Sequence, residues 1–352
     1  MPAPKNPFKQ ALSDGALQVG CWLGLADPYI AEISAGAGFD WVVVDAEHAP
    51  NDLRSIVAQL QVIAARSAHA VVRPPIGEAW ILKQLLDAGA QTLLVPMVES
   101  GAQARALVAA VTYPPHGIRG VGAALARASD FSGIGDYLTT ARDQICLLAQ
   151  VENKLGMDAL DDILAVEGID GVFIGPSDLA ADMGFIGQTN APEVQAAVLD
   201  AIKRIVASGK AAGILTLDVA LQRKCRDLGA TFIATDIDVT VFARNMRASA
   251  RQALALLPDQ NAKGSAETAH AGKYLQQLCK HWAHKAKAEF TPDSGSVVFE
   301  SGERVDMIAD PDKLLISAST GPRGDLERWK AVVVRHLERF AFREELCIRW
   351  DS

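Results

Sequence analysis

The sequence predicts an α/β fold, a (β/α)8 TIM barrel followed by a small α+β domain. Three observations carry this prediction. Short apolar runs alternate with segments of helical periodicity through about the first 255 residues, which gives eight β–α units. Glycine repeatedly follows a helical segment and precedes the next apolar run, as at Gly38 and Gly89, which is typical of helix ends. The composition then changes near residues 258–264, which predicts a second domain.

Eight apolar runs predict the strands of the barrel. They are Val19–Leu23, Trp41–Asp45, Ala70–Arg73, Thr92–Val95, Ile145–Val151, Gly171–Ile174, Ala212–Thr216 and Thr231–Thr235. The segments between these runs have the periodicity of amphipathic helices. They include Pro28–Ala37, Leu53–Ala65, Trp80–Ala88, Ala102–Val111, Pro192–Ser208 and Val219–Leu228. A doubly wound open sheet is the competing fold, but no G-x-G-x-x-G sequence follows the first strand.

The last part of the chain predicts a separate small domain with mixed helices and strands. Its expected helices are Thr268–Lys285 and Gly324–Phe340, and its expected strands are Ala288–Thr291, Ser296–Glu300, Arg304–Ile308, Leu314–Ala318 and Leu346–Trp350. Turn-forming residues from Pro258 to Ser265 indicate a linker. We therefore expect the barrel over residues 1–258, the linker over 259–265 and the small domain over 266–352.

The formal net charge of −8 limits the classes of partner. The last 91 residues carry 14 basic and 14 acidic side chains, so the excess lies in the first 261. An acidic barrel argues against a nucleic-acid partner, which needs a basic face. No apolar run approaches the roughly 20 residues of a bilayer helix, and the start of the chain has no secretory apolar region. The five scattered cysteines form no C-x-x-C, so we expect reduced thiols in the cytoplasm and no membrane association.

Polar side chains gather at the predicted C-terminal strand ends, where barrels place their chemistry. They lie in Asp45-Ala46-Glu47-His48, at Arg73, in Gln150-Val151-Glu152 and in Gly175-Pro176-Ser177-Asp178. A single Asp or Arg after a strand is most often a helix cap or a surface ion pair. The set brings two carboxylates at metal-ligand positions, a histidine, an arginine and an amide to one rim, which predicts a shared active site.

Glu152 and Asp178 follow neighbouring strands and supply hard oxygen ligands, which suit Mg²⁺ or Mn²⁺. Two carboxylates without a histidine ligand disfavour zinc. The segment Gly175–Asp178 opens a short helix whose free N–H groups are expected to bind an anion such as an α-keto carboxylate. The alternative interpretation of Asp178 is a plain N-cap, although one residue can cap the helix and bind a metal together.

His48 is expected to act as a base, directly or through a metal-bound water. Arg73 is permanently charged and is expected to stabilise an enolate oxygen. No lysine stands at these strand ends, which argues against Schiff-base chemistry. The residues therefore predict metal-assisted enolisation of a small keto acid, with cleavage or formation of a carbon–carbon bond.

Residues from about Pro7 to Leu257 closely resemble the HpcH/HpaI aldolase family, the class II pyruvate aldolases. The matching stretches are residues 20–25 (GCWLGL), 36–41 (GAGFDW), 45–51 (DAEHAPN), 71–74 (VVRP), 83–87 (KQLLD), 91–98 (QTLLVPMV), 113–122 (YPPHGIRGVG) and 172–179 (VFIGPSDL). The C-terminal part resembles a small bacterial domain of unknown function, with the signature YLQQLCKHWAHK from residue 274 to 285.

The resemblance implies a role for each matching residue. His48 matches the catalytic base, Asp87 the acid that raises the basicity of that histidine, and Arg73 the arginine that stabilises the transition state. Glu152 and Asp178 match the ligands of a divalent metal, Mg²⁺ or Mn²⁺ with Co²⁺ as a further option. Gln150 and the backbone of Ser177 and Asp178 match the pyruvate-binding positions. Ser177 stands where relatives often have alanine, and residues 215–218 and 235–238 also depart from the pattern.

The resemblance further implies an aldehyde-lyase of aromatic compound catabolism. Its substrate would be 4-hydroxy-2-oxoheptanedioate or a similar 4-hydroxy-2-oxo acid, cleaved reversibly to pyruvate and an aldehyde such as succinic semialdehyde. Family members exchange their eighth helix and form hexamers, so a homohexamer is expected. Two alternatives remain at this point. One is a citramalyl- or malyl-type lyase, which would need a basic groove for coenzyme A, and the other is a non-catalytic scaffold that binds keto acids.

Overall fold

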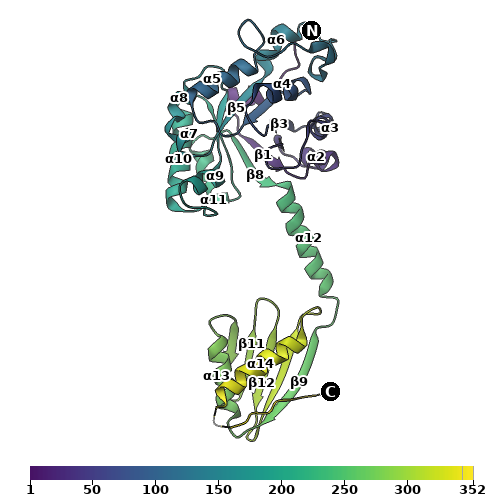
Figure 1. The fold of residues 1–352 in the computed structure, drawn as a ribbon, viewed down its shortest axis with the longest axis vertical. Helices are drawn as coiled ribbons and strands as arrows, with labels where there is room; N and C mark the ends of the chain where they lie inside the picture. Colours follow the sequence, from purple (N-terminus) through teal and green to yellow (C-terminus); the bar gives the residue numbers. More distant parts are fainter. Residues whose placement is uncertain (343, 352) are drawn as a thin grey trace. The chain divides into compact units, whose positions relative to one another are not determined.

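The computed structural model describes residues 1–342 and 344–351 (Figure 1). The chain forms two compact units, residues 1–244 and residues 245–352. The first unit is a closed barrel of eight parallel strands in the order β1 to β8, with β1 paired to β8. This confirms the predicted barrel. The strands are β1 (Gln18–Leu23), β2 (Trp41–Asp45), β3 (His69–Arg73), β4 (Thr92–Val95), β5 (Cys146–Val151), β6 (Gly171–Ile174), β7 (Ala211–Leu215) and β8 (Phe232–Ile237).

Helices connect the strands and surround the barrel (Figure 1). They are α2 (Pro28–Ala35), α3 (Leu53–Ile63), α4 (Ala79–Asp87), α5 (Gly101–Ala110), α6 (Tyr137–Gln144), α7 (Lys154–Asp158), α8 (Leu160–Leu164), α9 (Pro176–Asp182), α10 (Pro192–Ala207) and α11 (Val219–Asp227). In addition, α1 (Pro7–Ser13) precedes β1, and α12 (Asp238–Leu254) follows β8. Two 3₁₀ turns, η1 (Ala123–Leu125) and η2 (Arg127–Ser129), follow α5. The α1 helix was not predicted, because its seven residues are too few to show a helical period.

Large aromatic side chains fill the barrel interior. Trp41, Phe173 and Phe232 point inward from three strands, and Phe8 of α1 packs against Trp41 and Phe232. Gly20 makes room for this packing, since a Cβ there would lie 2.2 Å from the Trp41 ring. The interior is therefore a packed core, which leaves the strand ends as the place for a binding cavity.

His69 predicts a pH-dependent stability of the barrel. Its ring stacks on Phe8 with centroids 5.5 Å apart, and its Nε2 lies 2.9 Å from Oγ1 of Thr92. Burial lowers the pKa of His69 from 6.5 to about 4. The unfolded chain therefore binds a proton at His69 below pH 6.5, whereas the folded barrel binds it only near pH 4. Because of this difference, the free energy of unfolding falls by about 3 kcal/mol in all as the pH drops from 6.5 to 4.

A His69→Gln variant, whose amide can still bond to Thr92, is expected to lose this part of the pH dependence. The measurement is the free energy of unfolding in urea at several pH values between 6.5 and 4. His116→Gln, at an exposed position of the same unit, is the matched control. An unchanged pH slope in His69→Gln would contradict the assignment.

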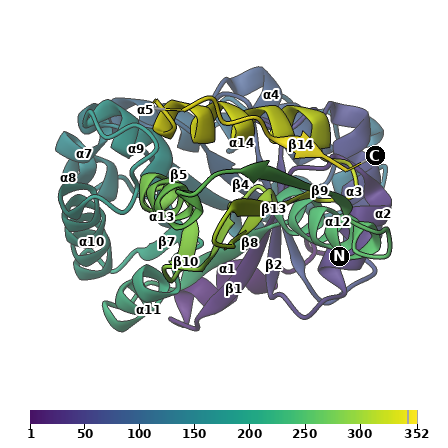
Figure 2. The ribbon, with the colours of Figure 1, turned by 90° about the horizontal axis from the view of Figure 1, so that it is seen from below.

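The second unit is a six-stranded antiparallel sheet covered on one face by two helices (Figure 2). The strand order is β10-β11-β12-β13-β9-β14. Its elements are β9 (Gln260–Glu267), α13 (Ala271–Trp282), β10 (Lys287–Phe290), β11 (Ser294–Val298), β12 (Arg304–Ala309), β13 (Lys313–Thr320), α14 (Leu326–Phe340) and β14 (Arg349–Trp350). The α13 helix packs against β10, β11 and β12, and α14 packs against β13 and β9. The predicted small α+β domain is confirmed.

The expected linker over residues 259–265 differs from the structure, where most of this segment belongs to β9. Eight consecutive residues of β9 pair with β13, and Gly264 also pairs with Trp350 of β14. A Cβ at Gly264 would lie 2.8 Å from the Trp350 ring, so the glycine permits this close pairing. Turn-forming residues suggested a linker, but pairing on both sides of β9 overrides their local preference.

The α12 helix begins at the end of β8 and carries an exposed apolar stripe. Its first residue, Asp238, is buried and accepts hydrogen bonds from the N–H groups of Gly24 and Leu25, at 2.8 and 3.2 Å. The side chains of Val239, Phe242 and Met246 are 40%, 54% and 54% exposed. Within the described residues, none of the helices has the length and apolar character to cross a bilayer.

Candidate active site

A cavity of about 650 Å³ lies at the C-terminal ends of the barrel strands. It brings together six of the seven predicted site residues, namely His48, Arg73, Gln150, Glu152, Ser177 and Asp178. Thr216 and Leu217 after β7 and Ile237 at the end of β8 also line it. The barrel topology thus collects side chains that are far apart in the sequence, as the strand-end pattern predicted.

Arg73 is held in place at the end of β3 by three neighbouring side chains. Its Nε and Nη2 donate to the two carboxylate oxygens of Asp45, at 2.9 and 2.6 Å. Its Nη1 lies 2.8 Å from Oε2 of Glu47, close enough for an ion pair although the angle is poor for a hydrogen bond. The Trp22 ring lies 4.9 Å from Cζ of the guanidinium. The guanidinium is therefore fixed in orientation before any substrate arrives.

The two carboxylates around Arg73 differ in their proton affinity. Burial would raise the pKa of Asp45, but the hydrogen bonds and charge of Arg73 hold it below its usual value. Burial raises the pKa of Glu47, and the charges of Arg73 and His48 offset only part of this effect. Asp45 is therefore the permanent anionic anchor of Arg73, because its bidentate geometry favours the charged form.

His48 stands at the mouth of the cavity. Its side chain is 67% exposed, and its Nε2 lies 3.9 Å from Oε2 of Glu47. Oδ1 of Asp45 accepts hydrogen bonds from the backbone N–H groups of Glu47 and His48, at 2.9 and 3.4 Å. The same carboxylate therefore orients Arg73 and shapes the turn that carries His48.

Glu152 is a buried carboxylate with an unusual environment. Its side chain accepts from the N–H of Met97, at 2.9 Å, and from Nε2 of Gln150. Gly175 lies against it, since a Cβ there would be 2.6 Å from Oε2 of Glu152. Burial raises the pKa of Glu152, and the negative charges of Glu47 and Asp178 raise it further. A cation at this point would relieve the repulsion among these carboxylates.

The donor set fits a hard divalent cation. Asp178 lies in the first turn of α9 and lines the same cavity as Glu152. It is not the N-cap, which is Gly175 without a side-chain capping bond. Oε1 of Gln150 is buried and has no hydrogen-bond partner among the described residues. The described part of the chain holds no cluster of three or more His, Cys, Asp or Glu side chains suited to a metal. The protein would therefore contribute two carboxylates and leave the remaining positions to water or substrate oxygens, as Mg²⁺ and Mn²⁺ sites commonly do.

Asp87 is the one predicted site residue that the structure does not bring to this cavity. It is the last residue of α4, and residues 88–91 lead directly into the N-terminal end of β4. Because barrel helices run antiparallel to the strands, Asp87 lies at the rim opposite His48. Its Oδ1 accepts a hydrogen bond from Nη2 of Arg119, at 2.8 Å. Within one chain, Asp87 therefore cannot contact His48.

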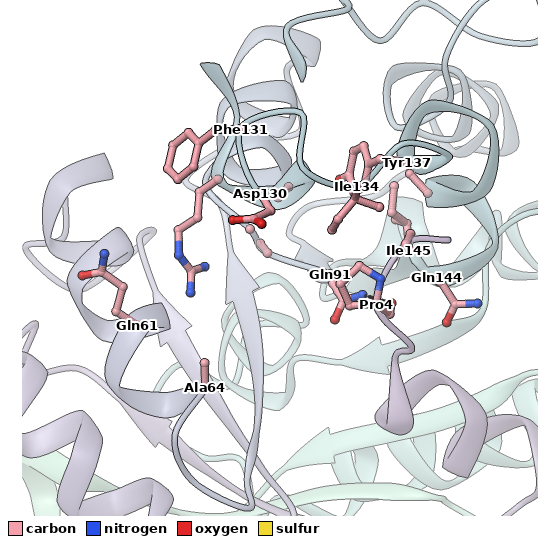
Figure 3. A pocket seen from close by; sticks show the side chains of 16 residues that line it. Pro4, Gln61, Ala64, Gln91, Asp130, Phe131, Ile134, Tyr137, Gln144 and Ile145 are labelled. Carbon is pink, nitrogen blue, oxygen red and sulfur yellow. Dashed lines mark hydrogen bonds between the residues drawn. The ribbon is translucent and has the colours of Figure 1, made fainter. Parts of the chain in front are cut away.

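A second cavity, of about 480 Å³, lies at this N-terminal rim (Figure 3). Its lining includes Gln91, Asp130, Ile134 and Tyr137, and Figure 3 shows the Asp130 carboxylate at the cavity. None of the predicted site residues lines it. Arg127 also lines this cavity. Its Nη1 donates to the carbonyl of Ala88 at 3.2 Å and so caps the end of α4.

Sequence reasoning missed the functional roles of three residues. Asp45 and Glu47 were visible as part of the strand-end sequence D-A-E-H, but nothing in that sequence indicates that both bind Arg73. Trp22 also lines the cavity and donates from its Nε1 to Oδ2 of Asp45, at 3.2 Å. The available signals were the position of Trp22 near the end of β1, which sends it to the same rim, and its place in the matching stretch 20–25.

Comparison with known proteins finds a matching family for each of the two parts of the chain. The family model HpcH/HpaI aldolase/citrate lyase matches residues 18–245, and DUF2218, described as an uncharacterized protein conserved in bacteria, matches residues 263–351. The chain is 61% identical over 255 residues to a hydroxypyruvate/pyruvate aldolase of Roseovarius nubinhibens, covering 72% of this chain and 98% of that protein. It is 54% identical over 246 residues to a 4-hydroxy-2-oxo-heptane-1,7-dioate aldolase of Salmonella dublin, covering 70% and 94%.

A solved structure agrees with these matches. The crystal structure of an HpcH/HpaI aldolase/citrate lyase family protein from Burkholderia cenocepacia has a TM-score of 0.68 and 38% sequence identity. The similarity covers 71% of this chain and 99% of that chain. The barrel unit thus has relatives along nearly their whole length, and the second unit matches a family without a described activity.

Proposed function

Because the chain belongs to the HpcH/HpaI aldolase/citrate lyase family, we propose that it is a divalent-metal-dependent aldolase. It cleaves a 4-hydroxy-2-oxo acid reversibly to a 2-oxo acid and an aldehyde. The observation that carries this proposal is the pre-oriented guanidinium of Arg73 in the same cavity as the carboxylates of Glu152 and Asp178. A positive group and a hard-cation site facing one volume suit an enolate, whose charge develops on oxygen.

The chemistry of the cavity and the names of the relatives support a proposal for the substrate class. The 2-oxo acid is pyruvate or hydroxypyruvate, and 4-hydroxy-2-oxoheptanedioate, which yields pyruvate and succinic semialdehyde, is one candidate aldol. Thr216 and Leu217 in the segment after β7 and Val239 in the segment after β8 line the cavity, and we expect the aldehyde to lie against them. These segments depart from the family pattern, so aldehyde choice is expected to depend on them.

Glu152 and Asp178 would hold the metal ion, which would supply Lewis-acid polarisation of the 2-oxo acid. Gln150 and the N–H groups of Ser177 and Asp178 would bind the substrate carboxylate at the start of α9. Mg²⁺ or Mn²⁺ suits these oxygen ligands, with Co²⁺ as a further option.

The chain's own residues perform the proton and charge steps. His48 accepts the proton of the C4 hydroxyl, and the C3–C4 bond breaks as the C4 oxygen becomes the aldehyde oxygen. The electron pair of that bond passes into the enolate of the 2-oxo acid, whose oxygen accepts a hydrogen bond from Arg73. Protonation at C3 then gives the 2-oxo acid, and His48 can return the proton.

We further propose that Asp87 supports His48 from a neighbouring copy, in a homo-oligomer that we expect to be a hexamer. Asp87 and His48 lie at opposite rims of one barrel, so only a second chain can bring them together. The exposed apolar stripe of Val239, Phe242 and Met246 on α12 supports an assembly, because a contiguous apolar stripe of this kind is commonly covered by a partner.

A panel of donors and aldehydes tests the proposed function. Purified full-length protein is incubated with pyruvate or hydroxypyruvate, with Mn²⁺ or Mg²⁺, and with aldehydes that include succinic semialdehyde, and aldol products are scored by mass spectrometry. We expect product with at least one 2-oxo acid donor and none with donors that lack the keto group. Failure of every donor and aldehyde pair would sink the aldolase assignment and favour a scaffold that only binds keto acids.

A further inference from the structure

Arg119 is a fully buried guanidinium that lies outside the cavity. Its side chain is 0% exposed, and its Cζ lies 4.4 Å from the Tyr113 ring and 5.9 Å from the Tyr137 ring. Asp87 is its carboxylate partner, at 2.8 Å from Nη2. Nε and Nη1 have no hydrogen-bond partner among the described residues. Burying a charge with unpaired donors is costly, which is typical of a residue kept for more than stability.

The surroundings hold Arg119 permanently charged. Burial would lower the pKa of Arg119, but the neighbouring tyrosines and the hydrogen bond to Asp87 outweigh it and keep the pKa raised. Burial raises the pKa of Tyr113 to about 12, so that phenol stays neutral near pH 7. The guanidinium is therefore a fixed positive anchor at the end of α4.

Asp87 is displayed at the protein surface in a defined orientation. Its side chain is 26% exposed, in contrast to the enclosed arginine behind it. Oδ1 is tied to Arg119, and Oδ2 lies 3.7 Å from where a Cβ on Gly122 would be. A Cβ there would make only an ordinary contact, so residue 122 does not enclose the second carboxylate oxygen. One oxygen is anchored inward while the carboxylate remains accessible from outside.

We propose that Arg119 is a positioning residue that orients Asp87 for contact with His48 of the partner subunit. This inference rests on the proposed function, in which Asp87 acts across subunits. An oriented carboxylate favours the imidazolium form and so makes His48 of the partner subunit a stronger base. Without Arg119, the carboxylate is free to rotate, and a misplacement of about 1 Å can cost up to roughly 100-fold in rate.

The first test is a double-mutant cycle between Arg119 and Asp87. We expect Arg119→Met to lower kcat by roughly 10- to 100-fold and to move the acidic limb of the kcat/KM profile to lower pH, as Asp87→Asn does. In the Asp87→Asn background, Arg119→Met is expected to cause little further loss. Arg119→Lys keeps the positive charge but not the planar guanidinium with its fixed donors, and it should recover part of the rate. Arg127→Met is the matched control, because Arg127 contacts the same helix end through Ala88 and is expected to leave kcat unchanged.

The outcomes separate this inference from the proposed function. If Asp87→Asn itself leaves kcat and the pH profile unchanged, the proposed role of Asp87 fails. If Asp87→Asn is impaired while Arg119→Met is normal, or if the two losses multiply, the positioning role of Arg119 is overturned. Size-exclusion chromatography checks that each variant keeps the oligomeric state of the wild type.

The second test uses mixed oligomers and does not require Arg119→Met to be stable alone. Chains with His48→Ala keep Arg119 and Asp87, whereas chains with Arg119→Met keep His48. Co-expressed, they should restore activity above the sum of the two separate variants, because an intact Asp87 can then face an intact His48 of the partner subunit. Activity no greater than that sum, in oligomers shown by mass spectrometry to be mixed, would contradict the inference.

Discussion

Replacing Arg73 by alanine is expected to lower kcat for aldol cleavage by roughly 10²–10³-fold, by analogy with the loss of one oxyanion donor. Arg73 is already oriented by Asp45, so its charge reaches the enolate oxygen without reorganisation. Because charge develops on that oxygen only as the C3–C4 bond breaks, kcat should fall more than KM rises. Arg73→Lys should recover little, since an ammonium cannot keep the bidentate contact. Steady-state kinetics of pyruvate release measures both variants.

The same substitution also has a structural cost that must be measured separately. Removing Arg73 leaves the buried Asp45 and the half-buried Glu47 without their cation, which costs about 3–5 kcal/mol of unfolding free energy. Arg204→Ala is the matched control, because its ion pair with Asp161 is partly exposed and contributes no more than about 1 kcal/mol. A folded Arg73→Ala protein with near-normal turnover would show that Arg73 does not stabilise the enolate.

Replacing Gly175 by alanine is expected to weaken metal binding by roughly 10- to 100-fold. The added Cβ would lie 2.6 Å from Oε2 of Glu152 and 2.8 Å from its Cβ, so the carboxylate must move. Activity should then require a higher Mn²⁺ concentration and should partly recover when that concentration is raised. The measurement is Mn²⁺ affinity by isothermal titration calorimetry, together with turnover as a function of added Mn²⁺.

Gly24→Ala is a matched control at the same cavity. A Cβ there would meet Val239 at 3.6 Å and Asp238 at 3.7 Å, which are ordinary contacts. Its Mn²⁺ affinity should equal that of the wild type. Equal affinity in Gly175→Ala as well would mean that Glu152 is not a metal ligand.

The barrel was largely predictable because its signals are local. Buried parallel strands read as short apolar runs, and glycines such as Gly89, with φ of 107°, mark where helices end. All eight predicted barrel strands are present, with ends within a few residues of the expected ones. The β9 strand was not predictable, since its residues form turns readily and only the pairing with β13 makes them a strand.

The sequence predicted six residues that line the cavity, but it did not predict the contacts between their side chains. Strand-end position identified Arg73 and Glu152, because the topology of a barrel sends every strand end to one rim. It gave no means to pair Arg73 with Asp45, because that contact depends on side-chain direction across two strands. The direction of α4 places Asp87 at the rim opposite His48, so any contact between the two residues must form between chains. Arg119 lies in a loop, and nothing in the sequence around it indicated a role.

The most direct test of the account is pyruvate release by the purified full-length protein from a 4-hydroxy-2-oxo acid, with and without EDTA. The account predicts release that EDTA abolishes and that Mn²⁺ or Mg²⁺ restores, in wild type but not in Glu152→Ala. Release that persists after complete chelation, or no release from any hydroxy-keto acid in the presence of either metal, would contradict a metal-dependent aldolase.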